Sequence, residues 1–65
     1  MTEKEMQLES IRIISRFQEE KIEKGAGMVI LAMTLAITFK EDGVPPHEAI
    51  NRFTTIVKNV YGGAP

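Results

Sequence analysis

The sequence contains no cysteine and no tryptophan, and it has a single histidine, His47. Without cysteine, neither disulfides nor thiolate-ligated zinc or iron–sulfur sites can form. One imidazole cannot build a histidine metal site alone. A domain of about 60 residues buries only about 60% of its unfolded surface, so without a disulfide or a structural metal its stability is marginal, and oligomerisation is the remaining way to increase it. We therefore expect no metal and no cofactor, and a core that is completed by self-association.

The charge is also unbiased, since eight basic and nine acidic residues leave a net charge of −1. Basic residues do not cluster, so nucleic acid is not expected as a partner. Glu3, Glu5 and Glu9 occupy positions where a signal peptide would need basic and then apolar residues. The uncharged run Met28–Phe39 would form a helix of roughly 18 Å, shorter than the ~30 Å of a bilayer core. These features predict a cytoplasmic protein without a membrane segment.

Hydrophobic periodicity predicts an all-α chain with helices at about 3–24, 28–42 and 46–61, in a single domain over residues 1–61. Residues 62–65 are expected to form a flexible tail. Thr2 and Glu5 have the spacing of a capping box at the start of the first helix. Around that helix, apolar side chains form one wide arc and charged side chains occupy the rest. The third helix carries an apolar stripe on one side only.

The breaks between helices are predicted from glycine and proline. Two glycines in Lys24-Gly25-Ala26-Gly27 would each cost about 1 kcal/mol inside a helix, so we expect a tight reversal there. A long helix that continues through Ala26 is the alternative. Gly43 and the pair Pro45-Pro46 are expected to end the second helix, and Pro46 is well suited to begin the third.

The run Met28–Phe39 is apolar on nearly every side and must be covered on nearly every side. A chain this small has little else to cover it with. We therefore expect a helical hairpin or three-helix unit that completes its core by homo-oligomerisation, first as a symmetric homodimer and second as a tetramer. The predicted interface residues lie on the first two helices: Ile11, Ile14, Phe17, Met28, Leu31, Leu35 and Phe39.

Catalytic chemistry is not expected, because no nucleophile and base can be paired from one histidine, no cysteine and two ordinary serines. The weak candidate for ligand binding is Lys24 with Gly25 and Gly27, which could offer backbone N–H groups and an ammonium to a phosphate. Its spacing matches neither the Walker A pattern nor the dinucleotide fingerprint. A turn between helices is the favoured interpretation of these residues.

The leading hypothesis is therefore a small accessory or regulatory protein that acts by binding another protein as a helical homo-oligomer. A dimeric DNA-binding regulator is the first alternative, because residues 35–57 superficially resemble a helix-turn-helix. Pro45-Pro46 is unusual in such a turn, and the second helix of the pair offers only Arg52 and Lys58 as basic groups. The second alternative is a nucleotide-like ligand bound at the subunit interface near Gly25–Gly27.

Overall fold

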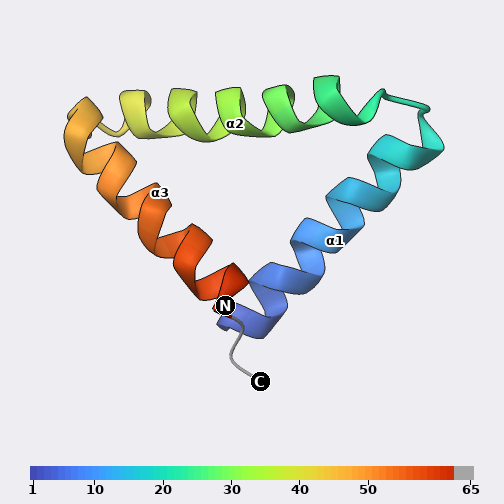
Figure 1. Cartoon of the computed structure of the whole chain (residues 1–65), viewed down its shortest axis with the longest axis horizontal. Coiled ribbons are helices and arrows are strands. Elements are labelled where there is room, and N and C mark those ends of the chain that lie inside the picture. The colour runs from blue at the N-terminus through green and yellow to red at the C-terminus, as the bar shows by residue number, and fades with distance from the viewer. Residues whose placement is uncertain (63–65) are drawn as a thin grey trace. The chain divides into compact units, whose positions relative to one another are not determined.

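The computed structural model describes residues 1–62, which contain three α-helices and no strand (Figure 1). They are α1 (Glu3–Glu19), α2 (Lys24–Glu41) and α3 (Pro46–Tyr61). The prediction of an all-helical chain is confirmed. Two compact units divide the chain, one over Met1–Leu31 and the other beginning at Ala32, so α2 contributes to both. The single domain stays a prediction, and of the expected tail, residues 63–65 lie outside the described residues.

The start of α1 is a capping box, as the sequence predicts. The Thr2 hydroxyl accepts the Glu5 backbone N–H at 3.1 Å, and the Thr2 N–H donates to the Glu5 carboxylate at 3.0 Å. Each side chain thus satisfies a backbone donor that the first turn of a helix leaves without an intrahelical partner. The hydrogen bonds from the Thr2 N–H and hydroxyl lower the pKa of Glu5, because they favour its ionised form.

The turn after α1 differs from its prediction. Helix α1 ends at Glu19 rather than at residue 24, and Lys21 takes a left-handed backbone conformation with φ of 58°. The Lys21 N–H donates to the Gln18 carbonyl at 3.1 Å and the Ile22 N–H to the Phe17 carbonyl at 3.0 Å. These two bonds form a Schellman motif, which closes the helix without a glycine.

Helix α2 consequently begins at Lys24 rather than at residue 28, and the expected reversal over Lys24–Gly27 is wrong. Gly25 and Gly27 lie inside α2. The alternative of one continuous helix is also wrong, because residues 20–23 separate α1 from α2. The propensity cost of glycine inside a helix is about 1 kcal/mol, and of the two glycines only Gly27 packs closely against α1.

The turn after α2 repeats the same motif with a glycine at the left-handed position. Gly43 has φ of 75°; its N–H donates to the Lys40 carbonyl at 3.1 Å, and the Val44 N–H donates to the Phe39 carbonyl at 3.0 Å. Both turns share one sequence pattern, a phenylalanine followed two and three residues later by acids and five residues later by isoleucine or valine. Helix α3 then begins at Pro46, where the sequence predicts it.

Burial is concentrated at the two corners where consecutive helices meet. Within residues 1–62, Gly27 alone is buried and no large apolar side chain is. Except for Val57, about three turns into α3, the half-buried apolar residues flank the two turns or lie within two helical turns of them: Phe17, Ile22, Leu35, Phe39, Val44 and Ala49. Residues 1–62 therefore contain no core of fully buried side chains, and most large apolar side chains of α2 are exposed.

The capping box generates a pH prediction. Because the Glu5 pKa is lowered in the folded chain, its contribution to α1 is present above the ordinary carboxyl pKa and is lost as the pH falls through the lowered value. Thr2→Ala should raise the Glu5 pKa toward its ordinary range and fray the start of α1. A carbon-13 carboxyl titration by NMR measures this. Ser10→Ala is the control, because the Ser10 hydroxyl bonds to the Met6 carbonyl instead, and it should leave Glu5 unchanged.

The left-handed residues generate a second prediction. Lys21→Gly should stabilise the protein by about 1 kcal/mol, because glycine adopts positive φ without the side-chain penalty. Gly43→Ala should destabilise it by a similar amount for the opposite reason. Thermal melts at one fixed protein concentration compare the two, with Lys21→Ala as the control that removes the lysine side chain but keeps the penalty. Equal melting temperatures for Lys21→Gly and Lys21→Ala would contradict the explanation.

Candidate functional site

The corner between α1 and α2 forms an open groove of about 290 Å³, here called the first groove. Apolar side chains make up most of its lining, and Gln18, Glu23 and Lys24 supply the polar part. A dry cavity of about 150 Å³ can hold a benzene molecule, so a groove of this size can accept a large apolar side chain. The lining residues come from both helices and the turn: Ile14, Phe17, Gln18, Ile22, Glu23, Lys24, Gly27, Met28 and Leu31.

Gly27 sets the closeness of the two helices at this groove. A methyl group placed on Gly27 would come within 3.1 Å of Phe17 Cδ2 and 3.8 Å of Ile22 Cγ2. The first distance is tighter than an ordinary van der Waals contact, so the phenyl ring occupies space that any larger residue needs. Gly27 is therefore a packing glycine, and the absence of a side chain is what lets α1 approach α2.

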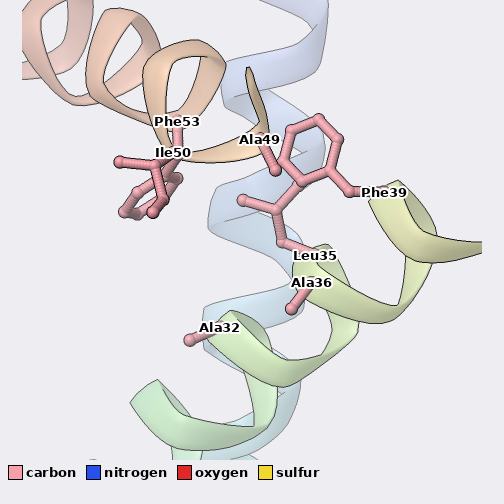
Figure 2. A pocket seen from close by; sticks show the side chains of 7 residues that line it. All are labelled: Ala32, Leu35, Ala36, Phe39, Ala49, Ile50 and Phe53. Atoms are coloured by element: carbon pink, nitrogen blue, oxygen red, sulfur yellow. The ribbon is translucent and has the colours of Figure 1, made fainter. Parts of the chain in front are cut away.

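The corner between α2 and α3 forms the second groove, of about 210 Å³. Its lining is entirely apolar: Ala32, Leu35, Ala36, Phe39, Ala49, Ile50 and Phe53. Figure 2 shows Leu35 and Phe39 projecting from α2 toward Ala49, with Ile50 and Phe53 contributed by α3. Small alanines on both helices leave room beside the larger side chains, which is why the groove stays open.

The two grooves are built from equivalent positions. A shift of 22 residues superimposes the two turn motifs in sequence, because it carries Phe17 onto Phe39 and Ile22 onto Val44. The same shift relates further lining residues of the first groove to those of the second: Ile14 to Ala36, Gly27 to Ala49, Met28 to Ile50, and Leu31 to Phe53. The chain thus uses one type of helix corner twice, with α2 as a member of both.

The predicted interface residues are divided between these grooves. The first groove contains four of them, Ile14, Phe17, Met28 and Leu31, and the second contains Leu35 and Phe39. Ile11 lines neither groove and is 57% exposed on α1. The sequence prediction did not assign Ala49, Ile50 and Phe53 to the site. The repeated turn motif is the signal for them, because it indicates that α3 packs against α2 in the way that α2 packs against α1.

The predicted ligand residues are placed differently from the expected phosphate cradle. Lys24 and Gly27 line the first groove, whereas Gly25 has open space beside it. The Gly27 N–H donates to the Glu23 carbonyl at 2.8 Å, so helix formation already uses it. Glu23 also lines this groove, and its negatively charged carboxylate would repel an anion. The geometry offers apolar surface here rather than an anion site.

Polar groups of the helices bond mainly to their own helix. The hydroxyls of Ser10, Thr38 and Thr54 each donate to the carbonyl four residues earlier. Arg52, one of the two basic residues of α3, pairs with Glu48 at 2.8 Å. Because these hydroxyls already donate hydrogen bonds within their own helices, the apolar side chains that line the grooves offer the main surface for recognition.

Charged and metal-binding sites do not emerge from the described part of the chain. Up to Gly62, no group of three His, Asp or Glu side chains is arranged to hold a metal ion. Over the same residues, no helix combines the length and apolar content that crossing a membrane requires. No protein-family model, curated protein or solved structure matches this chain. The two apolar grooves are the candidate binding sites of the described residues.

The packing role of Gly27 can be separated from its helix propensity. Gly25→Ala should stabilise the protein by about 0.5–1 kcal/mol, because its added methyl group enters open space in a helix. Gly27→Ala should melt below Gly25→Ala by about 4–8 °C, because the Phe17 ring has to move. Thermal melts at matched protein concentration measure both. If the two variants melt together, Gly27 does not set the helix spacing.

Proposed function

We propose that this chain is a small non-enzymatic accessory or regulatory protein that acts through protein–protein interaction as a helical homo-oligomer, with a homodimer as the basic unit. The observation that carries the proposal is the lack of any buried large apolar side chain within residues 1–62. Contiguous exposed apolar surface of this kind is typical of interaction sites rather than of soluble monomers.

The exposed side chains support an energetic argument. Ile11 is 57% exposed, Ile14 is 48% exposed and Met28 is 67% exposed. Full burial of a large apolar side chain contributes about 1.5–3 kcal/mol, so covering several of them on each chain is a substantial driving force for association. The two open grooves supply complementary concave surface, and an apolar helix face laid into such a groove is a common mode of recognition.

The positions of the charged residues also support the proposal. Arg12 pairs with Glu9 on α1, and Arg52 pairs with Glu48 on α3. Ion pairs of this exposed kind contribute little to stability, but they keep one face of each helix compatible with water. The apolar faces are then the surfaces that a partner chain can cover. Binding through helix faces requires no cofactor.

A two-part experiment tests the proposal. Sedimentation equilibrium should find the wild-type chain as a dimer or higher oligomer at roughly 100 µM, where even weak association is populated. Ile11→Asp with Ile14→Asp should shift it toward monomer or abolish partner binding, because both charges would have to be buried. Asn51→Asp with Asn59→Asp adds the same charge to the polar side of α3 and should change neither.

Circular dichroism of all three proteins shows whether the helices persist, so that loss of association is not confused with loss of folding. A wild-type chain that is monomeric at this concentration, with a cooperative melt, would overturn the proposal. Retention of both self-association and partner binding by the α1 double variant would remove α1 from the interface.

A further inference from the structure

One side of α2 carries an apolar seam with a charge at each end. From Lys24, residues spaced alternately by four and three positions follow this side: Met28, Leu31, Leu35, Thr38 and Asp42. This spacing is the heptad pattern of helices that pack along their length. All belong to one continuous helix or to the residue that caps it, so helical periodicity alone aligns them.

The middle of this seam is accessible to another chain. Met28 is 67% exposed, Leu31 is 37% exposed, and Leu35 is half-buried. Met28 and Leu31 line the first groove together with α1, Leu35 lines the second groove together with α3, and all three keep solvent-accessible surface. Thr38 brings no unsatisfied donor to the seam, because its hydroxyl donates to the Thr34 carbonyl at 2.8 Å.

We propose that a second copy of this chain packs its α2 antiparallel along this seam, with the two-fold axis at the level of residue 33. This rests on the proposed self-association and specifies its geometry. In this register Leu31 lies opposite Leu35 of the second copy, and Met28 lies opposite Thr38. The symmetry repeats each pair twice, as an isologous interface requires.

Charge complementarity selects the antiparallel direction. Lys24 lies opposite Asp42 of the second copy at both ends of the antiparallel pair, so each end joins an ammonium to a carboxylate. A parallel pair would instead place Lys24 beside Lys24 and Asp42 beside Asp42, and such like-charge contacts oppose association. The antiparallel arrangement also opposes the two helix macrodipoles, which a parallel arrangement would align.

The other side of α2 is a weaker site for the second copy. Val29, Met33 and Ile37 are exposed there and share a helix face. The same two-fold axis would place Val29 opposite Ile37. The ends of that face, however, would place Lys40 opposite Ala26, which offers no opposite charge. The seam from Lys24 to Asp42 is therefore the one that specifies both register and direction.

Charge exchange tests the pairing. Lys24→Asp alone, or Asp42→Lys alone, places like charges at both ends of the dimer and should weaken dimerisation by about tenfold. The double variant restores opposite charges and should return the dissociation constant to within about threefold of wild type. Each substitution also improves the match with the α2 macrodipole, so weaker dimerisation cannot result from a weaker helix.

Two further measurements complete the test. Lys40→Asp changes a charge on the opposite side of the same helix and serves as the control with little expected effect. Because the chain has no cysteine, Lys24→Cys and Asp42→Cys variants can be mixed and oxidised under mild conditions. The antiparallel pair should give mainly the mixed disulfide, which joins residue 24 of one copy to residue 42 of the other.

The outcomes separate this inference from the proposal on which it rests. Rescue by the double variant together with the mixed disulfide supports the antiparallel seam. A wild-type dimer whose single variants dimerise normally, or whose double variant is not rescued, overturns the seam but leaves self-association intact. Disulfides that join residue 24 to residue 24 overturn the antiparallel direction. A wild-type monomer overturns both the seam and the proposed homo-oligomer.

Discussion

Both helix corners depend on a left-handed residue that reverses the chain while two backbone hydrogen bonds close the preceding helix. Lys21 has this role after α1 and Gly43 has it after α2. The reversal brings an apolar residue back beside the phenylalanine of the last helical turn, as the shared proximity of Phe17 and Ile22 to Gly27 illustrates. A corner made in this way needs few side chains, so it can form in a chain too small for a conventional core.

Because each corner packs only a few side chains, most of the apolar surface stays exposed. A groove remains at each corner because the small residues found there, Gly27 in one and Ala49 in the other, let the helices meet closely without large side chains that could cover the rest of the corner. Stability and recognition are then drawn from the same surface, since whatever covers the grooves also completes the core. A protein of this type is expected to couple its folding to its association, so that its apparent stability rises with concentration.

Local sequence signals predict where α1 and α3 begin, but they do not predict the position of the turn between α1 and α2. The Thr2–Glu5 capping box and the start of α3 at Pro46 depend on neighbouring residues only, and the sequence predicts both. The prediction of a turn over Lys24–Gly27 depends on the cost of glycine inside a helix and on its preference just past a helix end. In the structure Lys21 takes the left-handed conformation instead, and its N–H and that of Ile22 close α1. Six of the seven residues predicted as an oligomer interface line the grooves, and the interface itself stays a prediction. The α3 lining depends on a packing arrangement that hydrophobicity alone does not specify.

The repetition of one corner accounts for the unusual composition of the middle helix. In a simple hairpin each helix has one neighbour and can turn its remaining sides to water. Helix α2 is the later arm of one corner and the earlier arm of the next, so it must be apolar toward two neighbours in succession. Helices α1 and α3 each pack against only one neighbour, so each keeps a wide charged or polar side. Tolerance to amino-acid substitution should therefore vary along the chain, and it should be lowest in α2, which belongs to both corners.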